Sequence, residues 1–228
     1  MMWGFPFFFG PSLLILLPAL AFAIYAQWKI RSTYGRYARV ESDRGTTARE
    51  AAARILSGAA VDGVTIETTN RRLSDHYDPR RKVLRLSAPD SASIAAVGVA
   101  AHEAGHAIQH ARGYGPLALR TAIVPIAGFG SQLAFPLFVV GLIAQVQPLI
   151  MAGIVLFSAA VLFTLITLPV EFDASRRAVG ALREAAIVNE EELGAVKEVL
   201  FAAALTYVAA AAMAVLQLVM LLTAGRRR

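Results

Sequence analysis

The chain has 228 residues, of which 57% are hydrophobic and only 17% are charged, and its mean hydropathy is +0.56. This composition excludes an ordinary soluble globular protein and indicates that lipid solvates much of the chain. The net charge of +6 would suit a nucleic-acid-binding protein, but the sequence contains no basic module with interleaved aromatic residues. Basic loops of a membrane protein explain the charge better, so we expect a lipid bilayer and not nucleic acid as a partner.

The first apolar stretch, residues 5–27, is long enough to cross a bilayer as a single helix. At 1.5 Å per residue it matches a hydrocarbon core of about 30 Å, and the first charged residue of the chain is Lys29. A cleaved signal peptide is the alternative, because small residues such as Ala19 and Ala21 imitate a cleavage site. No basic residue precedes the stretch, which favours a retained transmembrane helix.

Residues 28–120 are polar and mixed, which predicts a folded region outside the membrane. The first element expected in it is a short amphipathic helix over residues 46–58, where Thr47 and Glu50 have the spacing of a capping box. The Ala-rich stretch 91–112 predicts a longer helix near the end of this region.

Two short segments, 64–68 and 82–87, alternate apolar and polar residues and therefore predict half-buried strands. Between them lies LSDHYDPRR, in which Asp78 followed by Pro79 marks a turn. We expect a β-hairpin or a small sheet here. The sequence assigns no chemical role to the DHYDPR turn, and Tyr77 is not assigned as a donor to a reacting oxygen.

The second half of the chain predicts three more membrane spans. Residues 121–170 carry no charge and suit a pair of transmembrane helices, with a turn near Gln145 and Pro148. Residues 171–198 are charged again, and residues 199–225 form the last apolar span. The expected fold is therefore mainly α, a multi-pass membrane protein with four transmembrane helices and a small β-hairpin or sheet.

Basic residues near the span ends predict the orientation in the membrane. The side that holds residues 28–120 and 171–198 carries Lys29, Arg31, Arg36, Arg39, Arg112, Arg120, Arg176, Arg177, Arg183 and Lys197. The opposite side carries only the C-terminal arginines 226–228. Their position runs against the rule that basic residues near span ends lie in the cytoplasm. The balance places both polar regions in the cytoplasm, in a multi-pass protein of the cell membrane.

The strongest chemical signal is the segment AHEAGH, residues 101–106, which contains H-E-x-x-H on an expected helix. A spacing of four places His102 and His106 on one helix face, roughly 6 Å apart along the axis, so both imidazoles can reach one metal ion. Glu103 can reach a zinc-bound water without taking a coordination position, which suits a general base. Because the chain has no cysteine, zinc would be held by imidazole and carboxylate, as in catalytic zinc sites.

The motif is short and also occurs by chance, so the alternative is two surface histidines on an amphipathic helix. The flanking segments VGVAA and AGHAI are apolar. Two histidines and a glutamate would be costly to bury on such a helix without a bound partner. The flanks therefore favour a zinc site.

A third zinc ligand is required, and carboxylates after the third span are better candidates than the other histidines. His110 lies about 12 Å from His102 along the helix, too far to share its ion, and His76 lies in the predicted turn. Glu171 and Asp173 stand where the third span meets water. Two spans separate the motif from Glu171, so the chain returns to the same side of the membrane. The alternative is that Glu171 and Asp173 bind no metal and only anchor the end of the third span at the membrane surface.

Three segments carry a resemblance to a known family: AAHEAGHAIQHARGYGPLALR, LSDHYDPRRKVLRLS and LPVEFDASRRA. They resemble the YugP-type neutral zinc metallopeptidases of bacterial membranes, over nearly the whole chain. That family is similar to the HtpX and CAAX-prenyl-protease group, in which the glutamate of an E-x-x-x-D motif is the third zinc ligand. The resemblance implies Glu171 as that ligand. Ser175 stands in place of the aspartate, so Asp173 is expected to orient a ligand histidine instead.

The resemblance implies a gluzincin-like protease core fused to four spans, with Zn²⁺ as cofactor. The implied activity is endopeptidase cleavage of membrane or membrane-associated proteins, and the charge balance described above predicts that the active site faces the cytoplasm. A peptide substrate could pair with strand 82–87, or that strand could be purely structural. The sequence indicates neither a particular substrate nor an oligomeric state.

Two other functions remain to be weighed. A non-proteolytic membrane scaffold could retain a zinc site, but such a protein would not need Glu103. A transporter is disfavoured because residues 121–170 lack the ionisable groups that transport paths usually contain.

Overall fold

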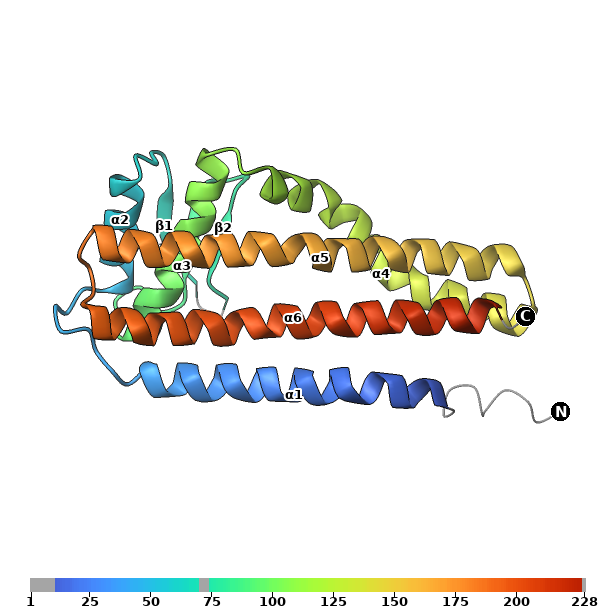
Figure 1. The fold of residues 1–228 in the computed structure, drawn as a ribbon. Helices are drawn as coiled ribbons and strands as arrows, with labels where there is room; N and C mark the ends of the chain where they lie inside the picture. The colour runs from blue at the N-terminus through green and yellow to red at the C-terminus, as the bar shows by residue number, and fades with distance from the viewer. Residues whose placement is uncertain (1–10, 70–73, 227–228) are drawn as a thin grey trace. The chain divides into compact units, whose positions relative to one another are not determined.

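The structure is a computed structural model that describes residues 11–69 and 74–226, and it is mainly helical with one small sheet (Figure 1). The chain forms two compact units. The span unit contains the described residues up to Gln27, Leu119–Leu168 and the residues from Leu205 onward; the site unit contains Trp28–Ala118 and Pro169–Ala204. The elements are α1 (Pro11–Tyr37), α2 (Ala48–Gly58), β1 (Thr65–Thr68), β2 (His76–Asp78), β3 (Val83–Leu86), α3 (Ile94–Ala111), α4 (Gly115–Ala144), α5 (Gln147–Glu184) and α6 (Glu190–Arg226).

Four helices, α1, α4, α5 and α6, are long and apolar enough to cross a membrane. The predicted fold class, a mainly helical protein with four such helices and a small sheet, is confirmed. Part of the expected span at residues 5–10 lies outside the described residues.

Helices α5 and α6 are longer than the sequence predicts, because the charged segment 171–198 is itself almost entirely helical. In α5, Ala174, Ala178 and Leu182 recur every fourth residue and are all buried, which is a helical pattern. Helix α6 begins beside Asn189, whose side-chain oxygen accepts the Glu192 N–H while the Glu192 carboxylate accepts the Asn189 N–H. This reciprocal capping starts the helix several residues before the apolar span.

Within the span unit, α4 and α5 pack closely because glycines line their contact. A Cβ on Gly141 would lie 2.6 Å from the Ile150 nitrogen, and one on Gly153 would lie 2.7 Å from the Ala134 oxygen. Small residues at such positions let membrane helices approach each other's backbones. The turn between the helices lies where the sequence predicts it, at Gln145, which has a φ of 58°.

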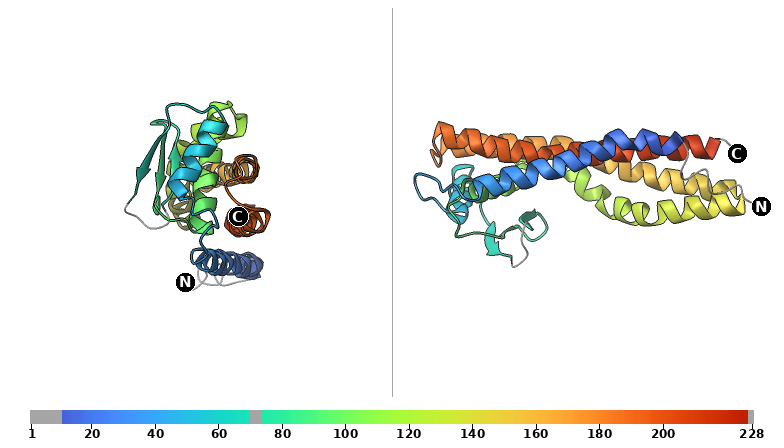
Figure 2. Two further views of the ribbon diagram at one scale, coloured as in Figure 1. Left: turned by 90° about the vertical axis from the view of Figure 1, so that its left-hand side faces the viewer. Right: turned by 90° about the horizontal axis from the view of Figure 1, so that it is seen from below.

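The site unit has three layers: the sheet, then α2 and α3, then the adjoining parts of α5 and α6 (Figure 2). The strand order is β1-β3-β2, with β1 parallel and β2 antiparallel to β3. Both expected strands are present, but the idea that the strand at 82–87 offers a free edge is wrong, because β3 is paired on both sides. The reason is that residues 76–78, expected within a turn, form the edge strand β2.

Helix α3 is the centre of the site unit, and nearly all of it is buried. Ser93 caps its first turn by accepting the Ala96 N–H. Small side chains along the helix allow α2, the sheet, α5 and α6 to pack around it in one apolar core. The predicted capping box of α2 is confirmed, since Thr47 and Glu50 exchange both hydrogen bonds. The buried polar side chains of α3 therefore lie among packed neighbours.

Candidate metal centre

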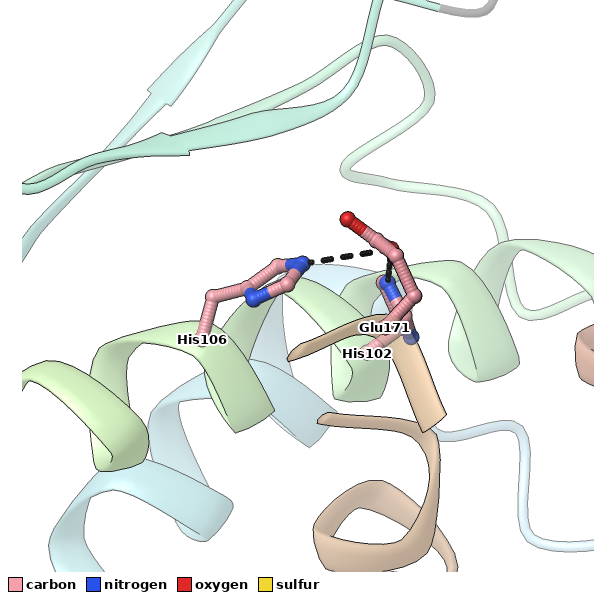
Figure 3. Close-up of side chains that lie close together, drawn as sticks. All are labelled: His102, His106 and Glu171. Carbon is pink, nitrogen blue, oxygen red and sulfur yellow. Dashed lines mark hydrogen bonds and ion pairs between the residues drawn. The ribbon is translucent and has the colours of Figure 1, made fainter. Parts of the chain in front are cut away.

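Three of the residues singled out in the sequence lie together. His102 and His106 extend from successive turns of α3, and Glu171 extends from α5 (Figure 3). One ligand atom from each of the three falls within 4.8 Å of the others. The Nε2 atoms of His102 and His106 lie 3.1 Å and 3.6 Å from Oε2 of Glu171. Two imidazole nitrogens and a carboxylate oxygen thus converge on one point.

The approach of α5 to α3 depends on Gly105, which lies between the two histidines in sequence. A Cβ at this position would lie 2.5 Å from the backbone oxygen of Ala174 and 3.3 Å from its Cα. Only a residue without a side chain fits against that backbone. Because Ala174 is one turn from Glu171 on α5, this contact sets how close the carboxylate comes to the imidazoles.

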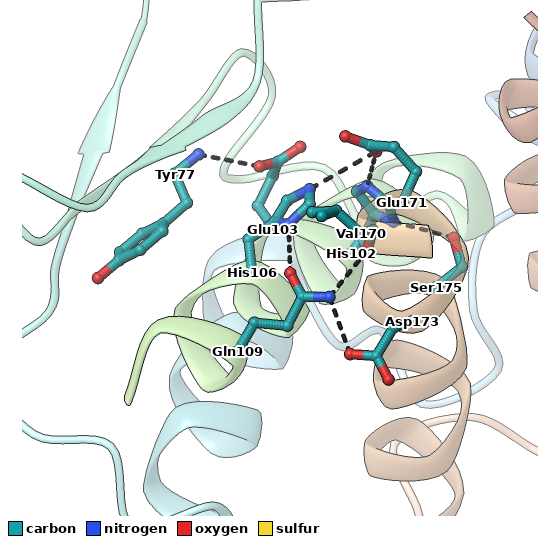
Figure 4. Close-up of polar contacts among 9 residues, drawn as sticks. All are labelled: Tyr77, His102, Glu103, His106, Gln109, Val170, Glu171, Asp173 and Ser175. Atoms are coloured by element: carbon teal, nitrogen blue, oxygen red, sulfur yellow. Dashed lines mark hydrogen bonds and ion pairs between the residues drawn. The ribbon is translucent and has the colours of Figure 1, made fainter. Parts of the chain in front are cut away.

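Each imidazole is oriented through its other nitrogen (Figure 4). His102 Nδ1 lies 3.1 Å from the Ser175 hydroxyl, and His106 Nδ1 lies 3.0 Å from Oε1 of Gln109. The buried Gln109 amide donates in turn to the Val170 carbonyl and to the Asp173 carboxylate, both at 2.8 Å. Outer partners of this kind fix the tautomer and ring orientation of metal-ligating histidines.

Asp173 lies outside the ligand cluster and touches neither histidine. The sequence predicts that it orients a histidine directly, but in the structure it reaches His106 only through Gln109, and its main partner is Arg177 at 2.6 Å. Ser175, which replaces the aspartate of the related motif, itself contacts His102. Sequence reasoning missed Gln109, although its place three residues after His106 on an apolar helix was the available signal.

Glu103 lies beside the cluster and is held by the edge strand. Its side chain is almost buried, and Oε2 accepts the Tyr77 backbone N–H at 2.9 Å. The Tyr77 hydroxyl lies 2.9 Å from Nδ1 of His110, so Tyr77 binds α3 at two points seven residues apart. Its ring points away from the cluster in Figure 4. Burial and the nearby Asp78 raise the pKa of Tyr77, which keeps the hydroxyl neutral.

The remaining histidines have other partners. His110 binds Tyr77, and His76 lies 2.7 Å from the Ser74 carbonyl and 3.2 Å from the Arg85 guanidinium. Neither belongs to a metal-binding group in the described part of the chain. The DHYDPR segment therefore has a structural explanation: it forms β2 and joins the sheet to α3.

The electrostatics of the cluster favour an added positive charge. Burial disfavours protonation of His106, but its hydrogen bond to Glu171 and the nearby carboxylates of Glu103 and Glu171 outweigh burial and raise the pKa of His106. The donor set, two imidazole nitrogens and a carboxylate oxygen, is one that catalytic Zn²⁺ sites use. The residues present therefore fit zinc.

Comparison with known proteins agrees with this donor set. A family model described as "Putative neutral zinc metallopeptidase" matches residues 12–226. The chain belongs to this zinc metallopeptidase family. It is also 45% identical, over 217 residues, to the "Putative membrane protease YugP" of Bacillus subtilis (strain 168), covering 93% of this chain and 96% of that protein. No solved structure matches the chain. The family resemblance predicted from the motifs is confirmed, and the four apolar helices support a membrane location.

We predict that Gly105→Ala weakens metal binding at this site, so that the purified variant carries much less zinc than the parent. The added methyl group would overlap the Ala174 backbone, so α3 and α5 must separate and carry Glu171 away from the histidines. Overpacking of this kind costs roughly 1–3 kcal/mol of stability. Zinc content by elemental analysis and the thermal unfolding midpoint measure the two effects.

Gly180→Ala is the matched control, because a Cβ at that position of α5 meets no atom within 4 Å. It should leave zinc content and stability near those of the unaltered protein. Equal zinc in the Gly105 and Gly180 variants would show that the close approach of the helices does not set the ligand geometry.

Proposed function

We propose that the protein is an integral membrane zinc endopeptidase, in which His102, His106 and Glu171 hold Zn²⁺ and Glu103 is the general base. The observation that carries the proposal is the convergence of the three ligand atoms within 4.8 Å, in a member of a zinc metallopeptidase family. The proposed substrates are peptide bonds of membrane or membrane-associated proteins. This class is suggested by the Bacillus relative, a "Putative membrane protease", and by the apolar helices of this chain.

Bound zinc would supply Lewis-acid chemistry, lowering the pKa of water and polarising a carbonyl oxygen. The chain's own residues then have separate tasks. Ser175 and Gln109 hold the imidazoles so that their Nε2 atoms face Glu171. Glu103 takes a proton from the attacking water and passes it to the leaving amide nitrogen. The Tyr77 N–H holds Oε2 of Glu103, which leaves Oε1 for the proton.

The edge strand β2 is the proposed binding edge for an extended substrate. It lies at one end of the strand order and its backbone contacts Glu103, whereas β3 is paired on both sides. A peptide that added to this edge would run past the proposed general base, with affinity from backbone hydrogen bonds to groups of β2 other than the Tyr77 N–H, which Glu103 holds.

The first test is Glu103→Gln, which should retain zinc and the fold but lose proteolysis. Removal of a general base typically lowers the rate by roughly 10²- to 10⁴-fold, and the amide can still accept the Tyr77 N–H. Cleavage of an unfolded membrane-associated protein by purified enzyme measures the rate. The control is Glu191→Gln on the exposed first turn of α6, which should behave like the parent. Activity near the parent level in Glu103→Gln would remove Glu103 from the mechanism, whereas no cleavage by the parent itself would favour the non-proteolytic scaffold.

The second test compares Glu171→Ala with Asp173→Ala. We expect Glu171→Ala to abolish high-affinity zinc binding, because it removes one of three protein ligands. Asp173→Ala removes a residue that reaches His106 only through Gln109, so its loss should not exceed the roughly 10- to 100-fold seen for outer partners. Zinc affinity is measured by competition with a chelator, after folding is checked for both. Loss of the metal in Asp173→Ala but not in Glu171→Ala would refute the assignment.

The third test concerns the proposed cytoplasmic orientation of the site, which the basic residues near the span ends support. The chain has no cysteine, so a single introduced one can be labelled cleanly. Arg81→Cys, in the exposed turn after β2, should react with an impermeant reagent only after cells are permeabilised. Gln147→Cys, at the exposed start of α5, should react in intact cells. The reverse pattern would invert the topology.

A further inference from the structure

A shallow groove of about 400 Å³ lies between α5 and α6 within the site unit. Each helix contributes four residues spaced at i, i+3, i+4 and i+7, so each presents one continuous stripe to the groove. The stripes are Phe172, Ser175, Arg176 and Val179 from α5, and Lys197, Leu200, Phe201 and Ala204 from α6.

The groove contains two exposed basic side chains, Arg176 and Lys197, and no acidic residue. Neither has a hydrogen bond or ion pair with any described residue. Arg176 contributes to the lowered pKa of Asp173, and Lys197 to that of Glu190. Asp173 already binds Arg177 at 2.6 Å, and Glu190 binds a different arginine through two hydrogen bonds. The positive charge in the groove is therefore available to an external anion.

The groove is apolar where each helix joins its hydrophobic run. Phe172 follows the uncharged residues 121–170 by two positions, and Phe201 lies just inside the uncharged run 199–225. Their side chains are 42% and 60% exposed. On both helices the basic residue lies about one turn farther from the hydrophobic run than the phenylalanine. The groove therefore pairs an aromatic end with a basic end.

We propose that this groove binds an anionic phospholipid, with the phosphate between Arg176 and Lys197 and an acyl chain along Phe172 and Phe201. Basic pockets between membrane helices bind anionic lipid headgroups in this way. The order of the residues matches the order of polarity in a lipid, from charged headgroup to hydrocarbon. A zwitterionic lipid offers the same hydrocarbon but carries no net charge to pair with the two cations.

The groove shares one residue with the metal centre. Ser175 lines the groove, and its hydroxyl also contacts Nδ1 of His102. A headgroup bound beside Arg176 would therefore adjoin the residue that orients one proposed zinc ligand. Lipid binding itself requires neither zinc nor proteolysis, so it can be tested even if the proposed activity is wrong.

The test uses the full chain in nanodiscs that contain spin-labelled phosphatidylglycerol or spin-labelled phosphatidylcholine. Electron paramagnetic resonance gives the fraction of each lipid that the protein immobilises. We expect preference for phosphatidylglycerol, and loss of that preference in Arg176→Gln/Lys197→Gln. Each basic residue near a bilayer surface contributes roughly fivefold to binding of an anionic lipid. The matched control is Arg80→Gln/Arg81→Gln, which removes the same charge from an exposed turn outside the groove.

A second variant separates a lipid from a free anion. Phe201→Ala removes an exposed ring and keeps both cations, so it should weaken retention of phosphatidylglycerol, and inorganic phosphate should not displace the lipid. Equal preference for phosphatidylglycerol in the parent and the Arg176/Lys197 variant would overturn the proposal. The proposal would also be overturned if Arg80→Gln/Arg81→Gln lost the preference for phosphatidylglycerol as much as Arg176→Gln/Lys197→Gln does.

Discussion

The close approach of α3 and α5 at Gly105 is the contact on which the metal centre depends. Two histidines on one helix can present their nitrogens to a common point, but they cannot complete a site without a third ligand from elsewhere. The proposed third ligand, Glu171, lies on α5, 65 residues after His106 in the sequence, and its carboxylate reaches the imidazoles only because no Cβ lies between the backbones at Ala174. The glycine in the motif thus has a steric role distinct from the chemistry of its neighbours.

The hydrogen bonds around the site explain how polar groups are tolerated in this core. His106, Gln109, Val170 and Asp173 form a chain in which each buried polar atom meets a partner, and Arg177 closes it at the surface. Buried networks stabilise a unique arrangement when every member is satisfied and are costly when one is not. The Nε2 atoms of the histidines lie at the inner end of this network. A cation there would neutralise the carboxylate and occupy the remaining lone pairs.

Local features of the fold were predictable from the sequence, and features that depend on tertiary packing were not. Capping at Thr47, apolar spans and the spacing of His102 and His106 are local, so they were read correctly. The strand at residues 76–78 was missed because it is three residues long and exists only by pairing with β3. Gln109 and Ser175 were missed because their roles arise from a helix distant in sequence. The sequence predicts too short an α5, because the change from apolar to charged residues at Glu171 suggests the end of a helix that in fact continues to Glu184.

The contact between Tyr77 and Glu103 bears on whether the site catalyses a reaction or only binds metal. A metal-binding scaffold needs the two histidines and Glu171, and each of these has partners that orient it. Glu103 contributes no ligand atom to the cluster, yet the edge strand gives it a backbone N–H, and the Tyr77 hydroxyl fastens that strand to His110. A buried carboxylate adds unfavourable desolvation beside an already anionic ligand, so a purely structural site would be more stable without it. The presence of this buried carboxylate beside the cluster and its positioning by β2 favour a role for Glu103 in proton transfer.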